Sequence, residues 1–404
     1  MSEPEHRPIV DEPFPRPQRW GDAEIARLTA AMRQSSLFYW QGPQTTAMLA
    51  EFRRHYPLAH VFPCSSGTAS IHLAVAALRL KPGDEIILPP ITDTGSALGI
   101  LHAQLVPVFA DIDPHTFNLD PAAVRRAITP KTRAILAVHL AGNPCDLDAL
   151  MALAREHKLV LIEDCAQAWG AHYRGRPAGL IGDLGCWSFN DFKHLSCGDG
   201  GVVGTNRDDI GRDLAKWGDK GYDRITNVRE PTELTHNYRM SEPLAAICAA
   251  QLEKLGGIVS QRHRTGMQLA AAIAGTPGII PPQFHPEDTP SFYHFLFRLD
   301  LAALSVSHAE FIAALRAEGV NAGPSSVGVP MYRYPLFQRH NFFGGTWPMR
   351  DFGLTTMDYT QVNCPAAEAF IADGVQLPWN EAITDTYAAK VARAITTVAR
   401  RFAR

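Results

Sequence analysis

The sequence has little that would place it outside ordinary globular proteins. Its 404 residues contain no apolar run of the roughly 20 residues that a membrane-spanning helix needs. The first twenty, MSEPEHRPIVDEPFPRPQRW, carry acids and prolines where a secretory signal has an apolar core. We therefore expect a cytoplasmic protein with no membrane segment and an extended N-terminal arm over residues 1–20.

Charge of one sign is also lacking. Lysine and arginine total 38 against 41 acidic residues, which gives a net charge of -3, and no basic tract stands out. Proteins that bind nucleic acid or anionic membranes show a basic patch or stripe. The sequence therefore indicates a small-molecule partner and neither nucleic acid nor membrane.

Paired cysteines are missing as well. The seven cysteines form no C-x-x-C pair, no C-x-x-C with distant histidines and no compact even-numbered framework. Such spacings mark structural metal sites and disulfide scaffolds. We expect free, buried thiols in a reducing compartment, and no metal.

What the sequence does contain is a regular alternation of strand-like and helical segments. From residue 58 to about 205, strands that are apolar throughout alternate with helices of about ten residues. This pattern is typical of a parallel sheet covered on both faces. After Gly275 the spacing becomes that of a smaller α+β unit. We predict an arm at 1–20, a large domain at 21–265 and a small C-terminal domain at 266–404.

The stretch CWSFNDFKHLSCGDGG, residues 186–201, places Lys193 between an apolar strand and a glycine-rich turn. Partial burial lowers the pKa of an amine toward that of a usable nucleophile, whereas a lysine before a turn is commonly solvated. Asp164 ends the predicted strand LVLIED, and the SGT of residues 66–68 opens a helix after an earlier strand. Ligands of open α/β sheets lie outside the carboxyl ends of the strands, so these residues should meet in one crevice.

An amine, a carboxylate and a helix start are the groups that pyridoxal 5'-phosphate requires. The lysine bonds to its aldehyde, the acid keeps the pyridine nitrogen protonated, and backbone amides at a helix start bind phosphate. Ser188, five residues before Lys193, could add a hydroxyl to the phosphate, and Gln167 could donate to the ring hydroxyl. Each signal alone has a plain structural explanation, such as a helix cap for the acid or an N-cap for SGT.

The order of these motifs resembles that of the DegT/DnrJ/EryC1/StrS aminotransferases. The resemblance covers nearly the whole chain after the arm and rests on segments such as SSGTASIHLAVAAL, LVLIEDCAQAWGAHYRG, SFNDFKHLSCGDGGVV and HNYRMSEPLAAICAAQLEKL. It implies fold type I of the pyridoxal phosphate enzymes, with a mostly parallel seven-stranded sheet and a smaller α+β domain. It also implies transfer of an amino group from glutamate or glutamine to a nucleotide-linked keto sugar or to a ketocyclitol.

Carried over by position, the resemblance makes Lys193 the catalytic lysine and Asp164 the partner of the pyridine nitrogen. Asn237 of HNYRM matches an asparagine that reaches the phosphate from the neighbouring subunit, which implies a homodimer with shared sites. A loop-capping side chain is the alternative for Asn237. The remaining cofactor contacts that it implies are Ser66, Gly67, Thr68, Gln167 and Ser188.

The chain departs from the family at Asp93, where members usually carry an aromatic residue that stacks on the pyridine ring. Either the stacking partner comes from elsewhere, or the alignment slips by a residue, or the carboxylate has a role with the substrate. Trp169 stands where histidine is common. It either contributes to the site in compensation or packs in the core.

A second departure concerns the substrate. The segment GPSSVGVPMYRYPLFQ stands where many sugar aminotransferases carry a His-Tyr-x-Pro-Leu-His type segment, and it is closer to the branch acting on free ketocyclitols or unusual keto sugars. Aromatic loop residues could contact such a ring, although they also serve as dimer or packing contacts. The candidate substrate residues are Tyr39, Trp40, Asp93, Tyr332 and Tyr334.

Two other functions stay open at this point. One is a dehydration or isomerisation with the same cofactor, which the residue at 193 disfavours because dehydrating members of the family carry histidine there in place of lysine. The other is a non-catalytic regulatory relative, for which Asp93 is the best support.

Overall fold

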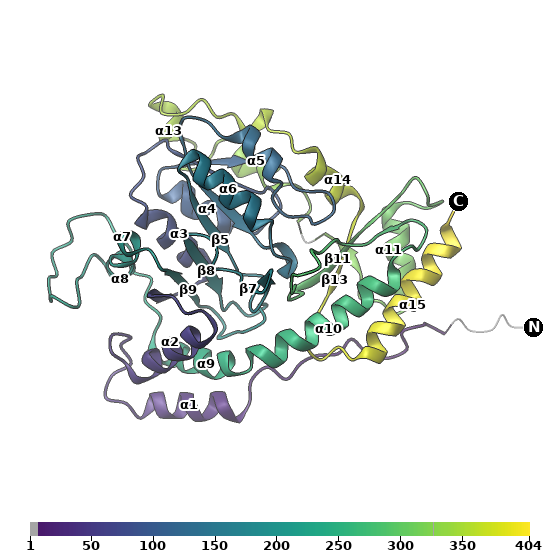
Figure 1. Ribbon diagram of the computed structural model, residues 1–404, viewed down its shortest axis with the longest axis horizontal. Helices are drawn as coiled ribbons and strands as arrows, with labels where there is room; N and C mark the ends of the chain where they lie inside the picture. The colour runs from purple at the N-terminus through teal and green to yellow at the C-terminus, as the bar shows by residue number, and fades with distance from the viewer. Residues whose placement is uncertain (1–6, 326) are drawn as a thin grey trace, which may run out of the picture.

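The computed structural model describes residues 7–325 and 327–404, which form two sheet units (Figure 1). In the seven-stranded sheet, β9 runs antiparallel to both of its neighbours, and all other neighbouring strands pair in parallel. This confirms the mostly parallel seven-stranded sheet. Its strand order is β1 (His60–Cys64), β9 (Gly201–Thr205), β8 (Leu184–Ser188), β5 (Val160–Asp164), β4 (Thr132–Val138), β2 (Glu85–Leu88) and β3 (Val106–Phe109).

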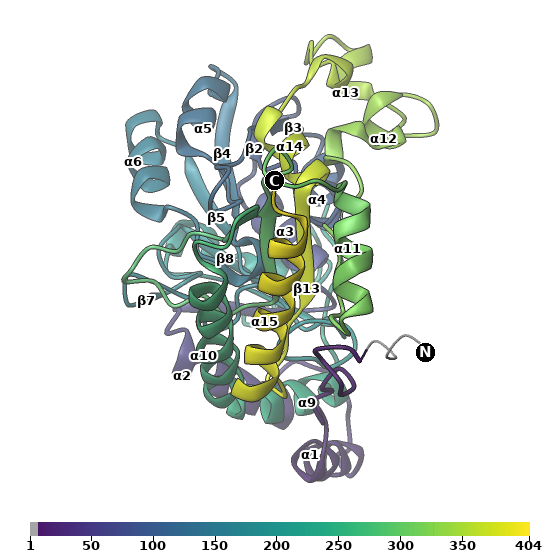
Figure 2. The same ribbon diagram turned by 90° about the vertical axis from the view of Figure 1, so that its right-hand side faces the viewer.

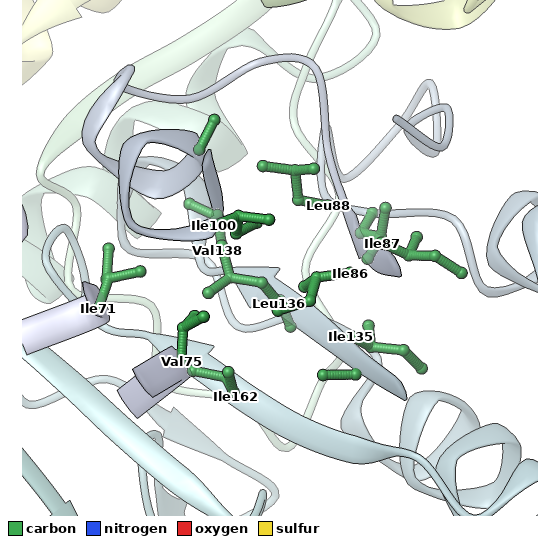
Figure 3. Close-up of a cluster of buried hydrophobic side chains, with 14 of the residues drawn as sticks. Ile71, Val75, Ile86, Ile87, Leu88, Ile100, Ile135, Leu136, Val138 and Ile162 are labelled. Atoms are coloured by element: carbon green, nitrogen blue, oxygen red, sulfur yellow. The ribbon is translucent and has the colours of Figure 1, made fainter. Parts of the chain in front are cut away.

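The apolar strands of this sheet are buried because helices cover them. Figure 3 shows side chains of α3 (Gly67–Ala77) and α4 (Gly95–His102) against those of the central strands. Burying one such aliphatic side chain stabilises the fold by about 1.5–3 kcal/mol. The residues labelled in this cluster are Ile71, Val75, Ile86, Ile87, Leu88, Ile100, Ile135, Leu136, Val138 and Ile162.

The carboxyl ends of the parallel strands form one edge, and the predicted site residues lie there. Asp164 is the last residue of β5, Ser188 is the last residue of β8, and α3 begins at Gly67, three residues after β1 ends. The connection from β2 to α4 crosses the same edge. The parallel topology therefore delivers a carboxylate, a hydroxyl and a helix start to one place.

The second sheet has four antiparallel strands and confirms the smaller α+β unit. Figure 2 shows α10, α15 and α11 side by side over this sheet. Helix α15 buries residues at spacings of three and four, which is the pattern of a helix with one apolar face. The elements are β10 (Ile279–Ile280), β11 (His294–Leu299), β13 (Gly374–Pro378), β12 (Gly323–Pro324), α10 (Leu255–Ile273), α11 (His308–Ala317) and α15 (Asp385–Phe402).

The two units are joined more closely than a boundary at residue 265 suggests. Helix α10 runs without a break across that position. Side chains between Met331 and Phe370 pack into the core of the seven-stranded sheet and not into that of the second sheet. The division into 21–265 and 266–404 stays a prediction.

The remaining elements surround these sheets. Helices α1 (Asp22–Met32), α2 (Pro43–His55) and α9 (Glu242–Glu253) pack together at one end, and the arm runs from there along the four-stranded unit (Figure 1). The other helices are α5 (Pro121–Ala127), α6 (Leu147–His157), α7 (Asp208–Gly211), α8 (Leu214–Gly218), α12 (Pro335–Gln338), α13 (Pro348–Asp351) and α14 (Pro365–Asp373). Single turns are η1 (Leu140–Gly142), η2 (Met331–Arg333) and η3 (Tyr359–Gln361), and β6 (His172–Tyr173) pairs with β7 (Arg176–Pro177).

Two sequence expectations can be compared with this architecture. All seven cysteines are buried and unpaired, as expected. None of the helices in the described parts of the chain has the length and apolar character to cross a membrane. The first six residues of the predicted arm lie outside the described residues.

Candidate active site

A cavity of about 340 Å³ opens at the carboxyl edge of the seven-stranded sheet. It brings together residues from four connections, of which two join a strand to a helix (β1 to α3 and β2 to α4) and two join one strand to another (β5 to β6 and β8 to β9). Seven of the residues singled out from the sequence line it, together with Ser96, Asn190 and Asp199, which sequence reasoning missed. Those seven are Ser66, Gly67, Thr68, Asp93, Asp164, Ser188 and Lys193.

Lys193 is half-buried and sits on a turn, where its amide donates to the carbonyl of Asn190 at 2.9 Å. Its Nζ lies 4.6 Å from the centre of the Tyr293 ring. An aromatic face attracts an ammonium group, so the ring holds the lysine side chain on one side of the cavity. Sequence reasoning missed Tyr293, because it follows the lysine by 100 residues and belongs to the second sheet unit.

Asp164 is almost completely buried, and both of its oxygens accept hydrogen bonds. Oδ1 accepts the amide of Ala166 at 3.0 Å, and Oδ2 accepts the hydroxyl of Ser96 at 2.9 Å. Burial raises the pKa of Asp164, and these hydrogen bonds with the charge of Lys193 oppose that rise only in part. A buried carboxylate of this kind strongly favours a cationic partner. Thr92, whose hydroxyl lies 2.9 Å from that of Ser96, orients the serine.

The start of α3 has the form of an anion cradle. The Ser66 hydroxyl oxygen accepts the amide of Ala69 at 3.0 Å, so its side chain acts as the N-cap. A Cβ at Gly67 would lie 2.6 Å from Cβ of Ser188, and one at Gly95 would lie 2.5 Å from the Thr68 hydroxyl oxygen. Only glycine lets these backbones approach so closely. The first helical amides and the Ser188 hydroxyl then share one small space.

Gln167 and Asn237 do not line this cavity. The Gln167 Oε1 accepts the amide of Ala141 at 2.8 Å, and within the described residues its Nε2 donates to no protein acceptor. Asn237 is exposed and pairs with Asp219 at the base of a loop that protrudes from the body beyond α8 (Figure 1). The roles that the resemblance gives these two residues stay predictions.

The candidate substrate residues separate into two groups. Asp93 lines the cavity, where its Oδ1 accepts the amide of Gly95 at 2.8 Å. Tyr334 is half-buried, and burial together with the nearby charge of Asp93 raises the pKa of its phenol, so these two residues are neighbours.

The other three aromatic candidates lie away from the cavity. The hydroxyl of Tyr39 donates to Asp219 at 2.7 Å, and Trp40 packs against the first core. Tyr332 is fully buried, and its hydroxyl donates to Glu368 at 2.8 Å. Packing between elements accounts for their positions in this chain.

Trp169 also has a packing role. It is fully buried against Phe52, Tyr56 and Phe189, and its indole N–H donates to the carbonyl of Ser188 at 2.7 Å. Of the two explanations left open by the sequence, the structure supports packing in the core. Its indirect contribution to the site is to fix the backbone of Ser188.

One buried group resembles a metal-ligand set within the described residues, formed by His139, Glu163 and Cys165. The two oxygens of Glu163 accept a bond from His139 at 3.0 Å and three backbone amides between 179 and 182. These bonds already satisfy the carboxylate. The group therefore supports the strand that carries Asp164.

Comparisons with known proteins agree with this geometry. Residues 19–396 match the model of the DegT/DnrJ/EryC1/StrS aminotransferase family. The chain is 33% identical over 348 residues to GDP-perosamine synthase of Caulobacter vibrioides, with 86% of this chain and 88% of the relative covered.

A second relative and a solved structure point the same way. The chain is 35% identical over 355 residues to a Streptoalloteichus tenebrarius protein named "Putative L-glutamine:3-amino-2,3-dideoxy-scyllo-inosose aminotransferase", with 85% and 83% covered. The X-ray structure of the aminotransferase from Psychrobacter cryohalolentis superimposes with a TM-score of 0.85 at 26% identity and covers 96% of this chain and 100% of that one.

Proposed function

The chain belongs to the DegT/DnrJ/EryC1/StrS aminotransferase family and is an aminotransferase, and we propose that it uses pyridoxal 5'-phosphate to aminate a keto sugar or ketocyclitol. The amino donor in this proposal is glutamate or glutamine. The observation that carries it is the placement of Lys193, Asp164 and the start of α3 around one cavity.

The donor set of the cavity fits this cofactor. The carboxylate of Asp164 is buried, and burial makes its charged form costly. A protonated pyridine nitrogen beside it would be the opposite charge that stabilises this form. Gly67, Thr68 and Ser188 would hold the phosphate, since the helix start offers amides and no side chain fills the space. Gln167 does not line the cavity but follows Asp164 by three residues, and in this proposal its Nε2 would donate to the ring hydroxyl. When bound, pyridoxal phosphate supplies the electron sink that lets a proton leave the substrate carbon.

Lys193 performs the proton transfer in this proposal. As a free amine, its Nζ would take a proton from the reacting carbon of the amino donor and deliver it to the aldehyde-derived carbon of the cofactor, two bonds away across the nitrogen, and it would do the reverse for the keto acceptor. The face of the Tyr293 ring, whose centre lies 4.6 Å from Nζ, confines the lysine side chain on one side. Confinement of this kind keeps the amine within reach of both positions.

Asp93 and Tyr334 are the proposed acceptor contacts. Asp93 lines the cavity where the family usually has an aromatic ring, and its charge acts on the phenol of Tyr334, so the two residues would offer a carboxylate and a phenol to hydroxyl groups. The names of the two relatives indicate amination of a nucleotide-linked sugar in one case and of a cyclitol in the other. The carboxylate of Asp93 and the phenol of Tyr334 support a ketone with several hydroxyl groups as the acceptor.

Asn237 would complete the phosphate site from the partner subunit of a homodimer. It is exposed at the base of the protruding loop, which leaves it free to contact another chain. A doubly charged phosphate calls for more donors than one helix start and one serine provide.

A screen of donors and acceptors tests this function. The holoenzyme is mixed with glutamate or glutamine and then with ketocyclitols or nucleotide-linked keto sugars, while loss and return of the visible cofactor band are followed. We expect Lys193→Ala to abolish turnover and to prevent borohydride from fixing the cofactor to the protein. Lys81→Ala, at an exposed lysine, is the matched control. Turnover by Lys193→Ala at the wild-type rate would overturn the assignment.

A further inference from the structure

The N-terminal arm is fastened to the four-stranded unit at several points. The amide of Val10 donates to the carbonyl of Glu318 at 2.9 Å, and the side chain of Asn380 donates to the carbonyl of Pro15 at 2.9 Å. The Nζ of Lys390 lies 2.8 and 2.9 Å from the carboxylates of Asp11 and Glu12. The first half of the arm therefore moves with this unit.

The far end of the arm holds the turn that carries Lys193. The guanidinium of Arg19 donates to the backbone carbonyls of both Asp191 and Lys193, and the indole of Trp20 donates to the carbonyl of Ser196 at 3.2 Å. A planar guanidinium that bonds two carbonyls two residues apart fixes the peptide planes between them. The Cα of Lys193 lies in this fixed stretch.

Arg19 is itself anchored to the large unit. Its carbonyl accepts Gln251 Nε2 at 2.8 Å and Lys254 Nζ at 3.1 Å. Both donors also bond the buried carboxylate of Glu24, at 2.7 and 2.5 Å. The position of Arg19 is thus set by the packing of α1 on α9, and its side chain points from there to the lysine turn.

The arm crosses the junction between the two units over a cavity of about 270 Å³. His194 and Gln251 line this cavity from the large unit, and Glu381 and Ala382 line it from the four-stranded unit. A displacement of the four-stranded unit would pull the arm against its anchor at Gln251 and Lys254, and the side chain of Arg19 reaches from that anchor to the backbone of the lysine turn.

We propose that Arg19 is a positioning residue for Lys193 and that the arm is a strap coupling the four-stranded unit to the lysine turn. This inference rests on the proposed role of Lys193 as the proton carrier. Displacing a reacting group by about 1 Å can lower a rate by about 100-fold, so a shift of the backbone that carries Lys193 should lower the reaction rate.

Three variants of the full-length holoenzyme test the proposal. Arg19→Ala removes both hydrogen bonds and the charge. Arg19→Lys keeps the charge but cannot bond both carbonyls with one planar group. Arg16→Ala is the control, because Arg16 is an exposed arginine of the same arm that makes no hydrogen bond or ion pair within the described residues. The readouts are amide hydrogen exchange at residues 190–197, kcat and KM, and the pH midpoint of the visible cofactor band.

We expect Arg19→Ala to speed exchange at 190–197 by about tenfold, because charged hydrogen bonds are lost there. It should lower kcat by about 10- to 100-fold with little change in KM, and it should raise the pH midpoint because a cation beside the turn is gone. Arg19→Lys should keep the midpoint and recover part of kcat. Arg16→Ala should match the wild type in every readout.

Unchanged exchange at 190–197 in Arg19→Ala would overturn the proposal, as would equal effects of Arg16→Ala. If Arg19→Ala fails to fold, the double variant Asn380→Ala/Lys390→Ala cuts the strap at its other end. That variant should also speed exchange at 190–197, and normal exchange there would reject the coupling. Because exchange does not depend on turnover, an active Lys193→Ala enzyme would overturn the proposed function and leave the test of the strap readable.

Discussion

The ring of Tyr293 faces the ammonium group of Lys193, with 4.6 Å between Nζ and the ring centre. The two residues come from different sheet units, so the lysine side chain is held at the junction between them. Cation and aromatic face attract one another by roughly 0.5–2 kcal/mol, depending on desolvation.

The first prediction concerns this contact. Tyr293→Phe keeps the aromatic face and should retain kcat within about threefold, whereas Tyr293→Leu should lower it by about tenfold. Steady-state kinetics of the two variants decide the point. Equal rates in both would show that the ring face does not position the lysine.

The hydroxyl of Ser96 gives a second prediction. Ser96→Ala removes the donor to Asp164 Oδ2, so the buried carboxylate loses part of its stabilisation and kcat should fall by about tenfold. Thr92→Val, which removes the hydroxyl beside Ser96 but not the bond to Asp164, is the control with a smaller expected loss. If Thr92→Val were the more damaging change, the serine would not act through the carboxylate.

The third prediction concerns the close packing around Gly67. Gly67→Ala places a Cβ 2.6 Å from Cβ of Ser188, which should weaken cofactor retention and lower stability by about 1–3 kcal/mol. Thermal unfolding and dialysis of the holoenzyme measure both effects. Gly256→Ala, also within a helix but with no heavy atom within 4 Å of the added carbon, should leave cofactor retention unchanged and should not lower stability, because alanine favours a helix over glycine. The idea of a tight cradle fails if the two variants behave alike.

Asp219 predicts how stability depends on pH. Burial alone would raise the pKa of this carboxyl, but hydrogen bonds from Arg224 and Tyr39 and the charges of Arg224 and Arg239 outweigh that effect. The pKa of Asp219 is therefore lower than that of a free aspartate. A carboxyl with a lowered pKa stabilises the fold above its ordinary pKa, and this stabilisation is lost as the pH falls through the lowered value.

Asp219→Asn tests that dependence, because an amide does not titrate. Its deficit in unfolding free energy should be about 3 kcal/mol at neutral pH and should shrink below about pH 4. Denaturant unfolding at a series of pH values measures it. A deficit that stays constant down to pH 2 would assign the stabilisation to something other than the ionised carboxylate.

The shared site gives the last prediction. Co-expression of Lys193→Ala with Asn237→Ala should produce hybrid dimers with one native site, and random pairing restores about a quarter of the sites. Co-expression of Lys193→Ala with Asp164→Asn is the control, since both residues line the same chain's cavity and no native site can form. If hybrid dimers are shown to form and no activity is recovered, Asn237 does not contact the phosphate of the partner subunit's site.

Much of the fold and part of the site can be predicted from the sequence. The apolar strands and the order of motifs identify Asp164, Ser188, Lys193 and the start of α3, because strand ends in a parallel sheet fall on one edge. Tyr293 could not be found in this way, because its contact depends on how the second unit packs. Neither could Ser96, whose hydroxyl partner depends on side-chain geometry.

The sequence also suggested contacts that the fold uses for packing. Tyr332 lies in a loop-like segment rich in glycine and proline, and this composition does not show whether its ring is covered. In the structure that segment folds back onto the first core, and the phenol is satisfied by Glu368. Burial of a loop residue follows from tertiary contacts, so local pattern does not reveal it.

The return of residues 331–370 to the first core has a consequence for shortened forms of the chain. Tyr359 packs on Phe109 of the edge strand β3, Phe370 packs on Phe117 just beyond that strand, and Trp347 packs on Tyr359, although all three are encoded far from β3. A gene fragment that ends near residue 265 would leave that apolar surface bare, and a deletion within the returning segment would do the same. Loss of this segment by mutation should therefore destabilise the first sheet unit as well as the second, and truncation of its buried side chains should be costly for the core beneath them.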